Sequence, residues 1–209
     1  MFYIFHGEDE FSRAEELARL RAKLAEGSDP AMADLNTSVL DSQVSLGELR
    51  HACDAIPFLA DRRLVIVHGL LSRLSQGRKG KKGGGPSAAQ QAYLRDLAAY
   101  LPQLPPTTRL IFIEDRTLPA SHPILKVAKE EGKKRRGFVK VFQPPKEGAL
   151  PGWIRRRVEG KGGHISSEAV TLLAALVGND LRQLDQEIEK LLLYAGGRQV
   201  TSRDVRLLV

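Results

Sequence analysis

Five short runs rich in β-branched or aromatic residues, separated by segments of helical periodicity, constrain the fold of this chain most strongly. The runs lie at residues 2–5, 33–40, 64–68, 110–114 and 138–142, of which the second is the weakest. Continuous apolar runs of this length between helices are typical of parallel strands that are buried on both faces. The pattern predicts an α/β domain with a mostly parallel five-stranded sheet and helices on both faces.

Helical patterns fill the rest of the chain and change in character after Pro144 and Pro145. Before these prolines, helices are expected at 11–25, 45–55, 87–101 and 123–131, between the strands. After them only helical patterns occur, at 147–159, 167–177, 180–194 and 202–208. A chain of 209 residues can form two modest domains. We therefore expect an α/β domain over residues 1–143 and a small all-α domain over residues 144–209.

The most regular helical pattern lies near the end of the chain. Apolar residues recur there at three- and four-residue steps, which places them on one stripe of a helix with charged residues on the other faces. Gly178 precedes this segment and Gly196 follows it as stop signals. The stripe consists of Leu181, Leu184, Ile188, Leu191 and Leu192. The helix must therefore pack against another element.

The chain is basic, with a net charge of +7, which favours encounters with polyanions. Much of the excess lies in clusters at 78–82, 133–136 and 155–157. No aromatic residues on which bases could stack are interleaved with them. Solvated surface is the simpler interpretation, and a weak phosphate contact is the alternative. The candidates for a DNA contact are Lys79, Lys81 and Lys82.

Several classes of chemistry find no support in the sequence. The single Cys53 lies in an apolar helical pattern and is expected to be a buried hydrophobe. The five histidines show no metal-binding spacing and are expected at strand ends or on the surface, and Trp153 is expected to anchor the core of the second domain. No signal peptide or membrane-spanning run is recognisable. We expect a cytoplasmic protein without a metal, a cofactor or a membrane partner.

The turn after the first strand resembles a phosphate-binding loop that has lost its functional residues. Laid on G-x-x-x-x-G-K-[ST], Gly7 fits, but Ser12 replaces the second glycine, Arg13 the lysine and Ala14 the hydroxyl residue. Carboxylates also stand at the start of the helix, where they would repel phosphates. These carboxylates belong to Glu8, Asp9 and Glu10. We expect no ATP binding at this turn.

The fourth run ends in Glu114 and Asp115 and so has the form of a Walker B strand. Without a phosphate loop, these acids are expected to form a polar strand end or a hydrogen bond to a loop. Catalysis and metal binding are the less favoured alternatives.

Apolar side chains also surround Pro57, which ends or kinks the helix before the third run. Ile56, Phe58 and Leu59 are therefore presented on a turn. They can pack either into the core or against a partner, and the residues alone favour the core.

The chain resembles the delta subunit of the bacterial clamp loader, a branch of the AAA+ family. The resemblance rests on residues 7–11, on 57–59 with 62–65, on the helix around Trp153, and most specifically on 179–194. It implies an AAA+-like domain without a working ATP site, followed by a helical lid domain. The implied role is to bind and open the sliding beta clamp for loading onto primed DNA, as a non-catalytic subunit of DNA polymerase III, a DNA-directed DNA polymerase.

The resemblance also assigns residues. It makes Ile56, Pro57, Phe58 and Leu59 the element that enters a hydrophobic pocket on the clamp, although the order Phe58-Leu59 inverts the Leu-Phe pair of some members. In this family a third, helical collar domain assembles the loader subunits and follows the point where this chain ends, so a shortened chain is expected. A DNA-binding module and a divergent AAA+ ATPase remain the alternative functions.

Overall fold

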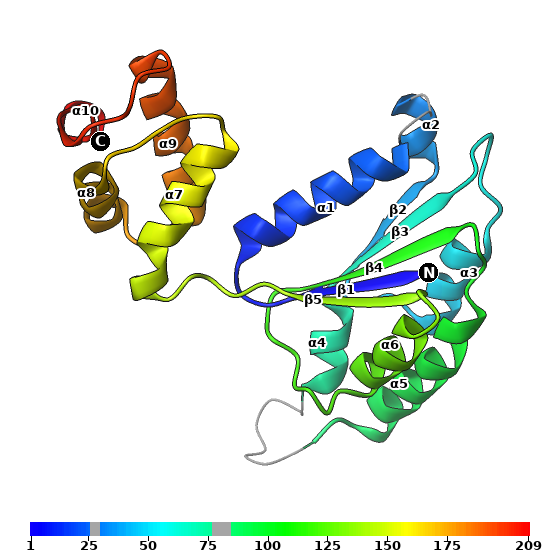
Figure 1. Ribbon diagram of the computed structural model, residues 1–209. Coiled ribbons are helices and arrows are strands. Elements are labelled where there is room, and N and C mark those ends of the chain that lie inside the picture. The colour runs from blue at the N-terminus through cyan, green and yellow to red at the C-terminus, as the bar shows by residue number, and fades with distance from the viewer. Residues whose placement is uncertain (26–29, 77–84) are drawn as a thin grey trace. The chain divides into compact units, whose positions relative to one another are not determined.

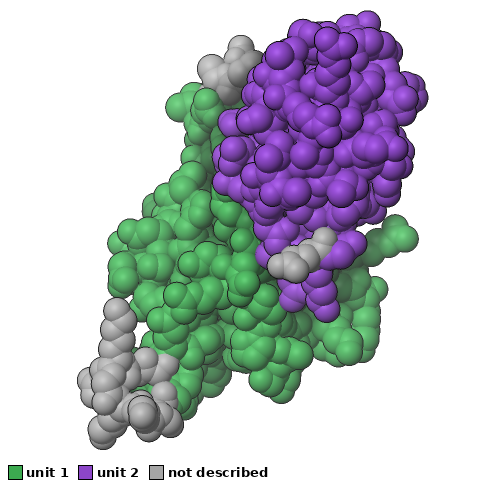
Figure 2. Space-filling view, turned by 90° about the vertical axis from the view of Figure 1, so that its left-hand side faces the viewer, with its two compact units in different colours: residues 1–142 green, residues 143–209 purple. Residues whose placement is uncertain are grey.

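The computed structural model describes residues 1–25, 30–76 and 85–209 of the chain. These residues form two compact units, Met1–Phe142 and Gln143–Val209 (Figures 1 and 2). The basic cluster with Lys79, Lys81 and Lys82 lies outside the described residues.

The first unit contains a five-stranded sheet in the order β2-β3-β4-β1-β5 (Figure 1). All four strand pairs are parallel, which confirms the predicted architecture. The central strands β1, β3 and β4 are buried along most of their length because helices cover both of their faces. The strands are β1 (Phe2–His6), β2 (Thr37–Leu40), β3 (Arg63–His68), β4 (Thr108–Glu114) and β5 (Gly137–Val141).

Helices cover the two faces of this sheet unequally. The single helix α1 (Glu10–Ala25) packs through Leu17, Leu20 and Leu24 on one face. The other face carries the larger core, in which buried side chains of four helices meet Phe2, Ile4 and Phe112. These helices are α3 (Leu46–Asp54), α4 (Leu70–Ser75), α5 (Ala88–Tyr100) and α6 (Pro123–Gly132). A 3-10 turn, η1 (Leu101–Gln103), follows α5.

Two local predictions for this unit were wrong. The run at 33–40 is a strand only from Thr37, because α2 (Pro30–Leu35) occupies its first part. Proline is well tolerated in the first turn of a helix, which permits α2 to start at Pro30. The second error is α4, which sequence analysis missed. Its leucines follow β3 after only Gly69. A six-residue segment of this kind carries too little periodicity to distinguish a helix from a strand.

The second unit is helical, as predicted, and one parallel bridge between Ile165 and Val200 joins its connecting loops. Its elements are η2 (Glu147–Ala149), α7 (Leu150–Gly160), α8 (Ser167–Val177), α9 (Leu181–Ala195) and α10 (Ser202–Leu208). The core includes Ile154 and Val158 of α7 and Leu173 of α8. Trp153 is partly buried on α7, and its role as the anchor of this core stays a prediction.

Helix α9 carries the amphipathic stripe that the sequence predicted. Leu181, Leu184, Ile188 and Leu191 are buried, and the Asp180 side chain caps the helix by accepting the amide N–H of Gln183 at 2.9 Å. The same helix is tied to α7 through Asp185, which forms ion pairs with Arg157 and Lys161. Its residues are thus used for caps, core packing and ion pairs within the unit.

The Asp185 ion pairs predict an acid-sensitive second unit. Partial burial acts to raise the pKa of Asp185, but hydrogen bonds and attraction from Arg157 and Lys161 outweigh it and lower the pKa below its ordinary value of 3.8. The pairs therefore add stability above that value and lose it as the pH falls through the lower folded-state pKa. Asp185→Asn should reduce the free energy of unfolding by about 1 kcal/mol at pH 7 and flatten its dependence on pH between about 5 and 2.

Urea unfolding followed by Trp153 fluorescence measures this effect, because the only tryptophan of the chain lies in α7. The matched control is Glu159→Gln, which removes the charge of an exposed carboxylate on α7. This variant should leave the pH dependence of the unfolding free energy unchanged. Equal profiles for Asp185→Asn and the unmodified protein would contradict the assignment.

Candidate functional site

The segment between α3 and β3, residues 55–62, is called the apolar loop here. Helix α3 starts at a capping box formed by Ser45 and Glu48 and ends at Asp54, before Pro57. Three large apolar side chains of the loop face solvent: Ile56 is 89% exposed, Phe58 59% and Leu59 76%. The expectation that they pack into the core was therefore wrong, and the surface alternative is the one observed.

The buried side chain of Asn36 holds this loop in place. Its carboxamide accepts the backbone N–H of Phe58 at 2.7 Å and donates to the carbonyl oxygen of Phe58 at 2.8 Å. The carboxamide also donates to the carbonyl oxygen of Met32 at 2.8 Å, and the backbone carbonyl oxygen of Asn36 accepts the N–H of Leu64 at 2.9 Å. Asn36 is only 2% exposed. The Asn36 side chain thus joins α2 to the apolar loop, and its backbone adds a bond to the beginning of β3.

Sequence analysis missed Asn36. Asparagine is depleted from strands, so its position inside the expected 33–40 strand was the signal that could have drawn attention to it.

Leu59 has a left-handed backbone conformation, with φ +48°. This conformation costs a residue with a Cβ atom roughly 1–2 kcal/mol. The hydrogen bonds of Asn36 to the preceding residue help to hold it. In this conformation the side chains of Leu59 and Phe58 lie at the surface and not in the core.

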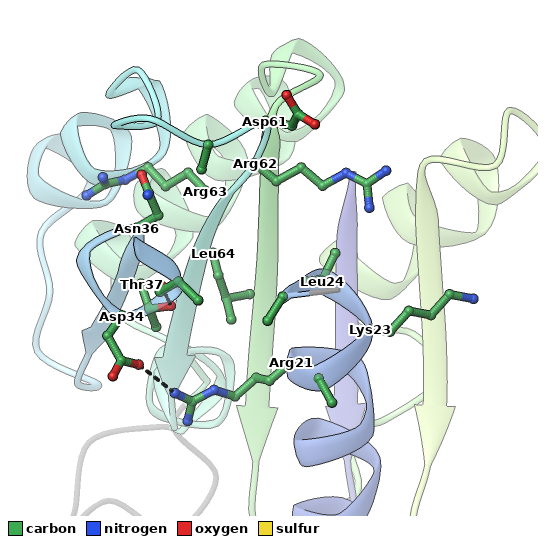
Figure 3. Close-up of a pocket in the computed structure, with 14 residues that line it drawn as sticks. Arg21, Lys23, Leu24, Asp34, Asn36, Thr37, Asp61, Arg62, Arg63 and Leu64 are labelled. Carbon is green, nitrogen blue, oxygen red and sulfur yellow. Dashed lines mark hydrogen bonds and ion pairs between the residues drawn. The ribbon is translucent and has the colours of Figure 1, made fainter. Parts of the chain in front are cut away.

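The two arginines that follow the loop differ in their contacts. Arg63 is a structural residue: its guanidinium donates to the carbonyl oxygen of Ala52 at 2.7 Å and to the hydroxyl of Ser38 at 2.9 Å. It therefore fastens the end of α3 to β2. Arg62 is exposed and extends across the neighbouring strand β4 (Figure 3).

A cavity of about 700 Å³ lies beside the apolar loop, between the end of α1 and the beginnings of β2 and β3 (Figure 3). Leu24, Asn36 and Leu64 lie along it together with charged side chains. Arg21 is paired with Asp34 at 3.8 Å, so part of this charge is neutralised within the wall. The positively charged members are Arg21, Lys23, Arg62 and Arg63.

The turn between β1 and α1 uses its polar groups internally. Asp9 is buried and accepts the N–H of Ser12 at 2.9 Å, so a carboxylate caps the helix where a phosphate would need to bind. Arg13 is also buried, and its guanidinium donates to the carbonyl oxygen of Gly7 instead of pointing outward. Gly7 has φ +128°, and a Cβ atom there would lie 1.9 Å from the carbonyl oxygen of Phe142. Glu8 adds an exposed carboxylate to the turn.

Glu114, the first acid of the Walker B-like strand, is a helix cap. Its two carboxylate oxygens accept the N–H groups of Leu71 and Ser72, each at 2.8 Å, at the start of α4. The side chain is 0% exposed, and burial raises its pKa although these hydrogen bonds act in the opposite direction. The predicted structural hydrogen bond is therefore present, but its partner is the start of a helix and not a loop. The adjoining Asp115 is exposed.

The remaining chemistry-bearing residues do not assemble into a centre. Within residues 1–25, 30–76 and 85–209, no three His, Cys, Asp or Glu side chains come close enough together to hold a metal ion. Cys53 is buried as predicted, and burial raises its pKa to about 12. His122 is buried at the beginning of α6, so the expectation of a surface or strand-end position was wrong for it. No helix in the described part of the chain could span a membrane.

The Asn36 contacts predict a measurable loss of stability. Asn36→Ala leaves the N–H and the carbonyl group of Phe58 without their partners, which should lower the free energy of unfolding by about 1–3 kcal/mol. Urea denaturation measures it. Gln103→Ala, which removes an exposed carboxamide bonded to the Ala99 carbonyl oxygen, is the control and should stay within about 0.5 kcal/mol. A loss no larger than that of the control would contradict the role of Asn36.

Comparison with known proteins agrees with this geometry. A family model described as "DNA polymerase III, delta subunit" matches residues 3–134. A DNA polymerase III subunit delta of Bacillus subtilis is 27% identical over 209 residues, covering 99% of this chain and 56% of the relative. A solved DNA clamp loader delta protein of Bacillus subtilis has the same fold, with a TM-score of 0.76, 24% identity, and coverage of 100% of this chain and 57% of that chain.

The chain thus spans little more than half the length of these two proteins. The family model matches more than half of the residues of this chain, and the matched part includes the apolar loop, Asn36 and the turn at Gly7. On this basis the chain belongs to the DNA polymerase III delta-subunit family.

Proposed function

We propose that this chain is the clamp-binding part of a clamp-loader delta subunit. In this role it binds the sliding beta clamp and opens it for loading onto primed DNA during replication. The observation that carries the proposal is the apolar loop, in which Ile56, Phe58 and Leu59 are exposed while Asn36 holds the backbone beneath them. Large apolar side chains that are held at the surface are typical of a site that binds a partner protein.

The size of this loop fits a compact hot spot. Burying a side chain such as Phe58 or Leu59 in a partner pocket contributes roughly 1.5–3 kcal/mol before the costs of association. A few residues of this kind can dominate the free energy of binding. Because Asn36 orders the loop in the free protein, less conformational entropy is lost upon binding.

Opening of the clamp then follows from differential binding. A subunit that binds an open clamp more tightly than a closed one shifts the equilibrium toward the open form, without any covalent step. The energy comes from contacts of the kind that Phe58 and Leu59 provide. This chain does not need to hydrolyse ATP to act in this way.

The geometry of the vestigial nucleotide site supports a non-catalytic role. Asp9 occupies the beginning of α1, Arg13 is bonded to Gly7, and Glu114 caps α4. All three groups are thus engaged in hydrogen bonds within the protein. ATP would act in neighbouring subunits of the loader, which this chain would contact through a third domain. A subunit with this role acts in the cytoplasm and touches DNA weakly or indirectly.

The proposal predicts that clamp binding depends on the loop. Phe58→Ala combined with Leu59→Ala should weaken binding to the cognate sliding clamp by about 100-fold, because two anchors worth roughly 1.5 kcal/mol each are lost. Calorimetry or surface-immobilised clamp measures the dissociation constant. Leu193→Ala with Leu207→Ala, which removes two leucines exposed in the helical unit, is the matched control and should bind as the unmodified protein does.

Equal binding by the loop variant and the control would remove the site assignment. Tight, magnesium-dependent binding of a fluorescent ATP analogue would contradict the non-catalytic role.

The backbone of Leu59 allows stability and binding to be separated. Glycine adopts φ +48° without the steric cost that leucine pays, and the Leu59 side chain buries little in the free protein. Leu59→Gly should therefore keep the free energy of unfolding unchanged or raise it by up to about 1 kcal/mol, while clamp affinity falls. Denaturation and the clamp-binding assay measure the two effects. A variant that loses both stability and binding would show that Leu59 supports the fold instead.

A further inference from the structure

The amino ends of the strands form an edge that continues from the apolar loop. In a parallel sheet, every segment that leads into a strand lies at the same edge. The loop leads into β3, and Arg109 stands near the beginning of β4, in register with Leu64. Side chains alternate along a strand, so Arg62, two positions before Leu64, projects to the same face as Arg109. Figure 3 shows Arg62 reaching across β4 in this direction.

Arg62 and Arg109 carry positive charge that no acid neutralises. Among the described residues, neither has a carboxylate within ion-pair distance. Arg109 donates to the carbonyl oxygens of Pro106 at 2.7 Å and Thr108 at 3.1 Å, which leaves the rest of its guanidinium available. Burial and repulsion by Arg62 lower the pKa of Arg109. The two positive charges therefore repel each other in the free protein, which raises its electrostatic free energy.

Other basic side chains of the sheet have partners within the fold. Arg136, at the beginning of β5, is paired with Glu131, and Lys140 is paired with Glu16 at 2.6 Å. Arg63 is bonded to Ala52 and Ser38. Within the described part of the chain, Arg62 and Arg109 thus lack the acid partners that Arg136 and Lys140 have. Arg63 has no acid partner there either, but its guanidinium is bonded into the fold between α3 and β2.

An apolar surface adjoins the two arginines. Tyr3 and Phe138 stack with ring centroids 5.2 Å apart, and Phe138 is 39% exposed. Of the two rings only Phe138 is exposed, whereas sites for single-stranded nucleic acid present a succession of aromatic side chains on which bases stack. A partner that covers them would exclude water and strengthen an ion pair to the arginines. This chemistry fits a folded protein surface with carboxylates better than a nucleic-acid strand.

We propose that Arg62 and Arg109 bind carboxylates of the sliding clamp, beside the pocket that receives Phe58 and Leu59. This inference rests on the function proposed above and extends its contact surface along the amino edge of the sheet. Arg62 follows Leu59 by three residues, a chain length that spans at most about 10 Å. A partner docked on Leu59 therefore lies within reach of Arg62. The arginines direct the approach of the clamp, and the apolar loop slows its release.

The test is the binding of the Arg62→Gln and Arg109→Gln double variant to the cognate clamp at several salt concentrations. Affinity at low salt should fall by about fivefold to tenfold, chiefly through a slower association rate, and its dependence on salt should become shallower. Arg62→Gln alone should show part of the effect without loss of stability, because Arg62 makes no hydrogen bond within the described structure. Arg155→Gln with Arg156→Gln, two exposed arginines of α7, is the control.

The outcomes separate this inference from the proposed function. An unmodified chain that does not bind the clamp would end both. Clamp binding that depends on Phe58 and Leu59, with an unchanged affinity and salt dependence in the arginine variants, would overturn only the arginine assignment. Loss of single-stranded oligonucleotide binding in those variants, with unchanged clamp affinity, would assign the pair to nucleic acid instead.

Discussion

The parallel pairing of the five strands is the constraint on which the rest of the first unit depends. It places every segment that leads into a strand at one edge of the sheet and every segment that leaves a strand at the other. The apolar loop and the two unpaired arginines consequently share one edge. The turn at Gly7 and the carboxylate of Glu114 lie at the opposite edge, where α/β folds commonly bind nucleotides. The same topology thus separates the exposed apolar loop from the turn that resembles a phosphate-binding loop.

The vestigial site shows how such an edge is stabilised by internal contacts. Asp9 caps α1, Arg13 bonds to the carbonyl oxygen of Gly7, and Glu114 caps α4. Each of these three buried groups has a hydrogen-bond partner within the unit, as is usual for buried polar groups. The polar residues that resemble a nucleotide site therefore make structural contacts within the unit.

The apolar loop stands in contrast to that edge. Its backbone is fixed by Asn36, while its side chains remain exposed and Leu59 keeps a strained conformation. A surface of this kind combines low ordering cost with unburied apolar area, and both favour association with a partner. The positive charge of Arg62 and Arg109 adds a long-range attraction that the apolar side chains cannot supply.

The sequence by itself determined the fold class, the parallel sheet and the helical character of residues after Pro144, because apolar periodicity reflects burial directly. It also located Phe58 and Leu59 on a turn. It further showed that the turn at Gly7 lacks the second glycine and the lysine of the phosphate-binding motif. Only the tertiary structure decided whether the loop faces the core or solvent, since an apolar residue beside a buried strand is compatible with both. The same holds for Asn36, whose role comes from backbone groups 22 residues away. Contacts over such a separation depend on how the elements pack together, which local sequence patterns do not encode.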